Sequence, residues 1–253
     1  MTDDLEFRVV ARVHRTPVII ELTLRPVVEP LAFRPGQYVL LGDPAGVVPV
    51  RSFSIANAPR DGGDLTVLVT RVPGGETSGW LHEVVRVGDP LLVSGPYGMF
   101  VRTGTATETG TVRPVLGLAA GSGLAPLRAL AEESAHAPTP RPFTVVFSAR
   151  TEADVMDADL FDRWSRRNPG LWFVRTLTRG AGRPPHGRVP ALLPELFPDL
   201  HDHEVFVAGP PGFVSACAAT AHDLGARPGR VHTEEFFADP QPWTAPLPAP
   251  VPA

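Results

Sequence analysis

The chain has 253 residues, which is enough for two domains of ordinary size. Hydrophobic residues make up 43% and charged residues 20%, a balance typical of a folded globular protein and not of a disordered or membrane chain. The net charge of -4 argues against nucleic acid or an anionic membrane as the main partner, because both favour a basic surface.

The cysteine content and the N-terminal sequence narrow the class further. Cys217 is the only cysteine, which excludes an intramolecular disulfide and a cluster ligated by four cysteines of this chain. It falls in a predicted helix, where we expect it to be buried packing. The first ten residues lack the basic-then-apolar order of a signal peptide, and no apolar run reaches the ~18 residues of a membrane span. We therefore expect a cytoplasmic protein.

The first 108 residues show short segments of alternating apolar and polar positions, separated by turns rich in Gly, Pro and Asp. Such spacing is typical of a small antiparallel β-barrel. The expected strands cover residues 7–13, 19–24, 37–41, 50–56, 65–72 and 90–93.

The pattern changes after a small, polar segment at 103–111, because strands and helices then alternate. Alternation of this kind predicts a parallel, doubly wound sheet. The expected strands are 112–119, 143–147, 171–177 and 204–208, and the expected helices are 123–135, 152–166 and 213–224. The chain thus divides into a barrel domain (1–108), an α/β domain (109–238) and a Pro-rich tail (239–253) expected to be extended or disordered.

The clearest nucleotide signal is the glycine-rich segment 117–126, which joins an apolar strand to a helix. Glycines let a backbone approach a pyrophosphate, and free amides at a helix start bind an anion. Tight packing alone is the alternative explanation for such a turn.

Two further segments suit a ligand that has both a phosphate and a flat ring. Residues 51–55 end a predicted strand with a cation, an aromatic ring and hydroxyls, and residues 74–81 contain a predicted helix start at Thr77 or Ser78. Taken singly, Arg51 is equally well a surface charge, Phe53 a core residue and Ser78 a plain N-cap.

The order of these segments resembles the ferredoxin-NADP reductase superfamily over about residues 5–237. The family segment R-x-[YF]-S matches Arg51, Phe53 and Ser54, which implies that they meet the flavin phosphate, the isoalloxazine ring and the region of flavin N5. The family segment G-x-x-[ST] at a helix start matches 75–78, which implies donation from Thr77 and Ser78 to the flavin pyrophosphate.

The second half resembles the nicotinamide-binding part of the same family. Residues 121–126 match G-[TS]-G-[IL]-A-P position by position, and residues 147–150 resemble the strand end that reaches the adenosine ribose. Residues 207–211 resemble the C-G-P segment beside the nicotinamide, although Ala208 stands in the cysteine position. Hydride transfer needs proximity more than an acid or base, so the alanine need not abolish activity.

The segment 231–237 resembles the family's terminal segment, where an aromatic ring covers the flavin near a carboxylate. Phe237 or Phe236 is the expected cover, and Glu235 or Glu234 the expected carboxylate. An edge strand with two packed aromatics is the alternative, since the sequence does not fix the register.

The resemblance thus assigns roles to a defined set of residues. The expected catalytic residues are Ser54, Glu235 and Phe237, and no metal site is expected. The expected cofactor-binding residues are Arg51, Ser52, Phe53, Ser54, Ile55, Thr70, Arg71, Gly75, Thr77, Ser78, Gly121, Ser122, Gly123, Pro126, Arg150, Ala208, Gly209, Pro210, Phe236 and Phe237.

The function implied is transfer of hydride from NAD(P)H to bound FAD, and then of single electrons to a separate iron-sulfur protein (a ferredoxin) or oxygenase component. Two alternatives stay open: a reductase of free flavin or another diffusible acceptor, and a non-catalytic nucleotide-binding subunit of the same fold. Arg150 is compatible with NADPH, whereas Glu152 and Asp154 favour NADH, which we take as the expected donor.

Overall fold

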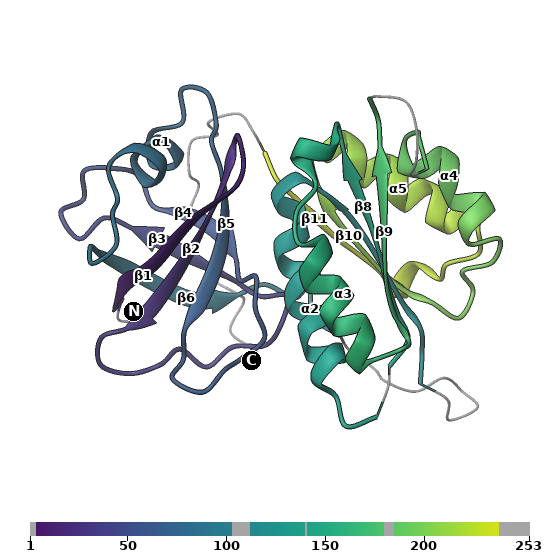
Figure 1. Ribbon diagram of the computed structural model, residues 1–253, viewed down its shortest axis with the longest axis horizontal. Coiled ribbons are helices and arrows are strands. Elements are labelled where there is room, and N and C mark those ends of the chain that lie inside the picture. The colour runs from purple at the N-terminus through teal and green to yellow at the C-terminus, as the bar shows by residue number, and fades with distance from the viewer. Residues whose placement is uncertain (1–3, 103–111, 140, 180–184, 238–253) are drawn as a thin grey trace, which may run out of the picture.

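The computed structural model describes residues 4–102, 112–139, 141–179 and 185–237. Figure 1 shows two lobes side by side, an antiparallel sheet at one end and a sheet flanked by helices at the other. Within the described ranges, no helix has both the length and the apolar character needed to cross a membrane. The expected boundary between 108 and 109 and the tail 239–253 lie outside the described residues.

The N-terminal lobe is one six-stranded sheet with the order β4-β3-β6-β1-β2-β5. An isolated antiparallel bridge between Ile55, directly after β4, and Val67 in β5 joins the two edges and closes the sheet into a barrel. The strands are β1 (Leu5–Thr16), β2 (Ile19–Pro26), β3 (Tyr38–Gly42), β4 (Arg51–Ser54), β5 (Leu65–Thr70) and β6 (Pro90–Tyr97), and helix α1 (Glu76–Glu83) follows β5.

The barrel interior is filled by alternate residues of its strands, as the period of a half-buried strand requires. Ile20, Leu22 and Leu24 of β2 are fully buried, and Val67 and Val69 of β5 face the same interior. This core fixes the register of the strands whose other ends build the site.

The C-terminal lobe is a five-stranded parallel sheet with the order β11-β10-β7-β8-β9. Its strands are β7 (Val115–Ala120), β8 (Phe143–Ala149), β9 (Leu171–Leu177), β10 (Glu204–Gly209) and β11 (Val231–Glu235). Short 3-10 turns η1 (Gly121–Gly123), η2 (Glu152–Asp154) and η3 (Pro228–Arg230) lie between the longer elements.

Both faces of the parallel sheet are covered, which is why β7 and β10 are continuous apolar runs. Val115 and Ala119 of β7 pack under one pair of helices, and Leu116 and Leu118 pack under the other. Figure 1 shows the two pairs on opposite faces. The helices are α2 (Leu124–His136) and α3 (Ala158–Arg167) on one face, and α4 (Val189–Leu196) and α5 (Pro211–Asp223) on the other.

The fold class expected from the sequence is confirmed, but one helix is not where it was expected. The predicted helix 152–166 is wrong, because η2 ends at Asp154 and α3 begins only at Ala158. Asp157 breaks the helix with a left-handed φ of 61°, and its buried carboxylate binds Arg15 and Arg128.

The expectation for Cys217 is confirmed. Its side chain is fully buried in the core under α4 and α5, and burial raises the pKa of the thiol to about 12. Helix α4 was not expected, because Pro190 and Pro194 fall inside an eight-residue segment.

Candidate active site

Expected site residues of the two lobes meet at two contacts, Ser54 with Glu234 and Thr70 with Ser122. The barrel contributes strand β4, the end of β5 and the start of α1, and the parallel sheet contributes the carboxyl ends of β7, β8, β10 and β11. In open α/β sheets, ligands bind in the crevice beyond the carboxyl ends of the strands. The barrel segments and the sheet ends therefore form two sides of one candidate site.

Strand β4 presents its residues on two faces. Arg51 and Phe53 lie opposite Leu41 and Val39 of β3, while Ser52 and Ser54 alternate to the other face. Arg51 donates to its neighbour's carbonyl at 2.9 Å, and Phe53 is half-buried against the barrel core. Ser52 is exposed.

The next residue, Ile55, is placed differently from the rest of this segment. Its side chain is fully buried in the barrel core, and its N–H donates to the carbonyl of Gln37 at 2.9 Å. Its expected contact with a cofactor stays a prediction that neither its side chain nor its N–H supports.

Helix α1 begins at Glu76 with Gly75 at its N-cap, so Thr77 and Ser78 stand in the first turn and not at the cap as expected. The Thr77 hydroxyl donates to Pro49 O at 2.5 Å, and Ser78 Oγ accepts from the N–H of Val72 at 3.1 Å. Both hydroxyls therefore serve the barrel itself. The first N–H to bond back to a carbonyl of this turn is that of Gly79, to Gly75 O at 2.9 Å, so the earlier amides point out of the helix start.

This helix start fits a diphosphate. A Cβ on Gly75 would lie 2.7 Å from Ser78 Oγ, so only glycine keeps the backbone this close to the first turn. The Arg71 guanidinium lies against Gly79, 3.2 Å from the position a Cβ would take, and bonds Glu83 Oε1 at 2.7 Å. Outward amides beside a held cation are a donor set for a phosphate group.

On the nicotinamide side, the turn after β7 packs directly on the turn after β10. A Cβ on Gly123 would lie 2.2 Å from the carbonyl oxygen of Ala208 and 2.7 Å from Gly209 N. Ser122 and Pro126 are buried beside this contact, and Gly121 opens the turn. The two backbones approach so closely that glycine is required at 123.

The turn after β10 contains the departure from the family pattern. Ala208 is fully buried, with its side chain in the core beneath α2. Gly209 follows. Pro210 is the N-cap of α5, and the Pro210 carbonyl accepts the N–H groups of Phe213 and Val214 at 2.9 and 3.0 Å. The cysteine position is therefore filled by a packed methyl group.

Two hydroxyl contacts join the flavin-side strands to the nicotinamide-side elements. Ser54 Oγ donates to the Glu234 carboxylate of β11, and Thr70 Oγ1 at the end of β5 donates to Ser122 Oγ at 2.8 Å. Burial raises the pKa of Glu234 to about 7, although the hydrogen bond from Ser54 lowers it. Burial also raises the pKa of Tyr38, which stands opposite Ser54, and the charges of Glu234 and Tyr97 add to this.

The last described residues give the register that the sequence left open. Glu235 pairs with Gly209 and is exposed, whereas Glu234 pairs with Ala208 and reaches Ser54. Phe236 is half-buried against the sheet core and donates its N–H to Gly209 O at 2.8 Å, while Phe237 is 56% exposed. The catalytic roles of Glu235 and Phe237 stay predictions.

The residues expected to reach the adenosine ribose lie at the ends of β8 and β9. Arg150 is exposed, and its carbonyl accepts the N–H of Arg179 at 2.9 Å. Glu152 lies 3.7 Å from Arg175 Nη1, and Asp154 caps the turn through Thr151. Both acids that favoured NADH are thus engaged by neighbours.

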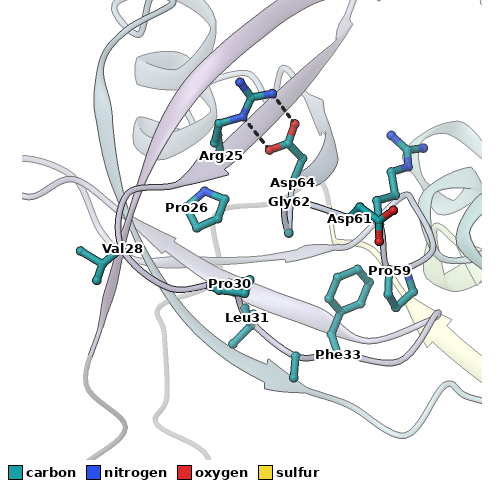
Figure 2. A pocket seen from close by; sticks show the side chains of 13 residues that line it. Arg25, Pro26, Val28, Pro30, Leu31, Phe33, Pro59, Asp61, Gly62 and Asp64 are labelled. Atoms are coloured by element: carbon teal, nitrogen blue, oxygen red, sulfur yellow. Dashed lines mark hydrogen bonds and ion pairs between the residues drawn. The ribbon is translucent and has the colours of Figure 1, made fainter.

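A hollow of about 620 Å³ lies elsewhere on the barrel. Figure 2 shows it between the loop after β2 and the loop before β5, with Phe33 and prolines on its walls and an ion pair from Arg25 to Asp64 on its edge. Asp64 directly precedes β5, whereas Thr70 ends it, so about 20 Å of strand separates the hollow from the site. It is not part of the candidate active site.

Comparison with known families covers both lobes. Residues 7–101 match the family described as "Oxidoreductase FAD-binding domain", and residues 118–219 match "Oxidoreductase NAD-binding domain". A ferredoxin--NADP reductase B from Sorangium cellulosum (strain So ce56) is 32% identical over 248 residues, which cover 92% of this chain and 98% of that protein. The chain belongs to the ferredoxin-NADP reductase superfamily. This confirms the family expected from the sequence, with its FAD and NAD(P)H cofactors.

Two other relatives are longer than this chain. The reductase component 1 of terephthalate 1,2-dioxygenase from Comamonas sp. is 29% identical over 88% of this chain, which spans 66% of that protein. The crystal structure of a cytochrome P450 reductase from Amycolatopsis superposes with a TM-score of 0.85 and 30% identity, covering 94% of this chain and 71% of that one. Both matches include residues of the barrel and of the α/β domain of this chain.

Sequence reasoning missed one side chain of the site, Tyr38. It lies beside Ser54 across the β3–β4 pair, and its ring lies 5.7 Å from that of Tyr97. The alternation of β3 predicts that Tyr38 and Leu40 share a face, but only the β3–β4 register brings Tyr38 to Ser54. No signal along the sequence gives that register.

Proposed function

We propose that this chain is an NAD(P)H-dependent flavoprotein reductase that delivers electrons singly to a separate ferredoxin or oxygenase component. The observation that supports it best is the pair of contacts from Ser54 to Glu234 and from Thr70 to Ser122, which bring the flavin-side strands against the nicotinamide turns. A site that must bring two cofactors together needs both sides within reach of each other.

The barrel residues would hold the flavin. Arg51 supplies a cation for phosphate, the start of α1 supplies backbone amides, and Arg71 stands beside them. When bound, FAD would supply the chemistry that side chains lack, by accepting two electrons together and releasing them one at a time. The remaining work of the protein is binding, orientation and control of protons.

Glu234 is the group placed to hold a proton. With a pKa of about 7, its carboxyl is protonated in part of the molecules at neutral pH, and Ser54 Oγ donates to its carboxylate form. A carboxyl tuned near the working pH is what general acid–base chemistry favours. We infer that Glu234, and not the exposed Glu235, is the carboxylate of the site.

The turns after β7 and β10 would receive the nicotinamide with backbone groups. The backbones approach so closely at Gly123 and Ala208 that a side chain at position 123 would not fit. Binding there would therefore depend on backbone amides and on the shape of the turns. We keep NADH as the expected donor. The proposal also expects a cytoplasmic location, because NAD(P)H is supplied there.

The proposal of a separate acceptor is supported by the names of two relatives, the reductase component 1 of a terephthalate 1,2-dioxygenase and a cytochrome P450 reductase. This chain has one cysteine, and that residue is buried with a pKa near 12, so its own residues offer no four-thiolate site. We therefore propose that the iron-sulfur centre that takes the electrons lies outside these residues, on a separate ferredoxin or oxygenase component.

The test is a coupled assay with purified holoprotein, NADH or NADPH, a two-iron ferredoxin and cytochrome c. We expect cytochrome reduction that depends on the ferredoxin, with FAD copurifying as a yellow cofactor. Colourless protein that turns over only added flavin would instead favour the free-flavin reductase. Absence of turnover with every acceptor would favour the non-catalytic subunit.

A further inference from the structure

Helix α2 lies along the seam between the lobes and presents two buried charged side chains, Arg128 and Glu132, to the barrel. They are four residues apart and so share one face of the helix. Arg128 is 4% exposed and Glu132 is 7% exposed. Charged side chains are rarely buried this deeply unless they are paired.

The Arg128 guanidinium joins three separate elements. Its Nε donates to the carbonyl of Ala56 at 2.6 Å, and its Nη1 binds the carboxylates of Glu21 in β2 and, at 3.1 Å, Asp157 before α3. Asp157 is also bound by Arg15 of β1. Two barrel elements and two helices of the α/β domain thus meet at one cation.

Glu132 makes the second attachment one helical turn later. Its Oε2 accepts the N–H of Ala58 at 2.9 Å, and its Oε1 accepts from Arg60 at 2.6 and 3.2 Å. Together, Arg128 and Glu132 bind three residues within the barrel segment 56–60. We call these contacts of Arg128 and Glu132 the interdomain clamp.

The place of the clamp in the chain relates it to both halves of the site. The barrel segment 56–60 directly continues strand β4 through Ile55, and α2 directly continues the turn Gly121–Gly123. One rigid helix is therefore attached to the continuation of the flavin strand and begins at the nicotinamide turn. A shift of this helix on the barrel moves the nicotinamide turn relative to β4.

We propose that Arg128 is a positioning residue, which through the interdomain clamp sets the separation between the flavin strand β4 and the nicotinamide turn Gly121–Gly123. The inference deepens the proposed function and rests on it. Movement that separated these groups would leave charges unpaired in a low-dielectric interior, which is costly. Misplacement of reacting groups by about 1 Å costs on the order of 100-fold in rate.

The first measurement is a distance and does not depend on activity. Because Cys217 is buried, spin labels can be attached to cysteines introduced at the exposed Val84, directly after α1, and at Arg166 of α3. In FAD-loaded protein with Arg128, we expect one narrow distance distribution by pulsed electron resonance. Arg128→Met should broaden or shift it.

The second measurement separates the two half-reactions of the holoprotein. Arg128→Met should slow flavin bleaching at saturating NAD(P)H by about 10- to 100-fold. Reoxidation of photoreduced protein by ferricyanide should proceed at the wild-type rate, because it does not use the nicotinamide turn. General damage to the fold would slow both steps.

Matched variants guard against a trivial result. Arg25→Met removes an arginine–aspartate pair within the barrel, whose N–O distances are 2.8 and 2.9 Å, and it should leave both measurements unchanged. If Arg128→Met does not fold, Glu132→Gln removes a charge from the same clamp at nearly constant volume. It should change the distance distribution and the bleaching rate in the same direction, but less.

The outcomes distinguish the inference from the function on which it rests. A wild-type bleaching rate and an unchanged distance distribution in the folded Arg128 variant would overturn the inference. A wild-type protein that neither donor bleaches would overturn the proposed function, while the distance measurement would still decide whether the clamp fixes the two lobes.

Discussion

The flavin side of the site is built mainly from side chains, whereas the nicotinamide side is built mainly from backbone. On the flavin side, side chains are already held by the barrel: Thr77 by Pro49, Ser78 by Val72, and Arg71 by Glu83. On the nicotinamide side, the turns after β7 and β10 meet backbone to backbone, with Gly123 against Ala208. The flavin side is therefore defined by side-chain functional groups, and the nicotinamide side by close packing of two backbone turns.

This difference predicts how each side responds to substitution. A changed side chain on the flavin side removes one interaction and leaves the barrel intact. An added carbon on the nicotinamide side displaces a whole turn. Substitutions on the two sides should therefore differ in how far they disturb the fold.

The largest effect is expected for Gly123→Ala, because its Cβ would fall 2.2 Å from Ala208 O and 2.5 Å from the carbonyl carbon. Overpacking against backbone costs about 3 kcal/mol, the upper end for such changes. Urea unfolding should show this loss, and the variant should bind nicotinamide poorly while retaining FAD. Gly212→Ala in α5 meets nothing within 4 Å and should be neutral or stabilising. Equal behaviour of the two variants would contradict the backbone contact.

Arg51→Gln should weaken flavin binding and leave the fold unchanged. Loss of charge-assisted hydrogen bonds to a phosphate costs about 2 kcal/mol, or roughly 30-fold in the dissociation constant of FAD. Fluorescence titration of flavin-free protein measures it, with the exposed Arg8→Gln as the control. Unchanged FAD affinity would remove Arg51 from the flavin side.

Glu234→Gln should change how stability depends on pH. The raised pKa means that the folded protein binds this proton more tightly than the unfolded chain. Stability should therefore fall as pH rises from about 4.5 to about 7, with a slope of up to about 1.4 kcal/mol per pH unit, and then level off. Unfolding of flavin-free protein between these values should show this slope in the wild type and a flatter one in the variant. Identical slopes would mean that Glu234 titrates normally.

Thr70→Val should have the smallest effect, because it removes one hydrogen bond of 2.8 Å to Ser122 at constant shape. A single neutral hydrogen bond contributes about 1 kcal/mol. We expect the free energy of unfolding to fall by this amount. The hydride-transfer rate should change less than it does in the Gly123→Ala variant. A larger rate effect than for Gly123→Ala would reverse the comparison of the two sides.

Local patterns predicted the order of the fold well. The alternation in β2 and the apolar run of β7 are patterns of residues adjacent in sequence, so the sequence predicts the barrel and the parallel sheet. The glycine-rich turn was located because both its strand and its helix are adjacent in sequence. Helix α2, expected over 123–135, occupies Leu124–His136.

The features that sequence did not predict depend on distant partners. Asp157 breaks the expected helix 152–166 with its carboxylate bound to Arg15 of the barrel, more than a hundred residues away. The choice between Glu234 and Glu235 follows from the pairing of β11 with β10. Arg128 gave no motif, because its partners come from three separate segments.

We propose that the barrel and the α/β domain together pass electrons from reduced nicotinamide through bound FAD to a separate acceptor. Anaerobic stopped-flow mixing of the yellow holoprotein with NADH and with NADPH tests it most directly. We expect rapid bleaching of the flavin by at least one donor, followed by reoxidation when a two-iron ferredoxin is added. Flavin that stays oxidised with both donors would contradict it.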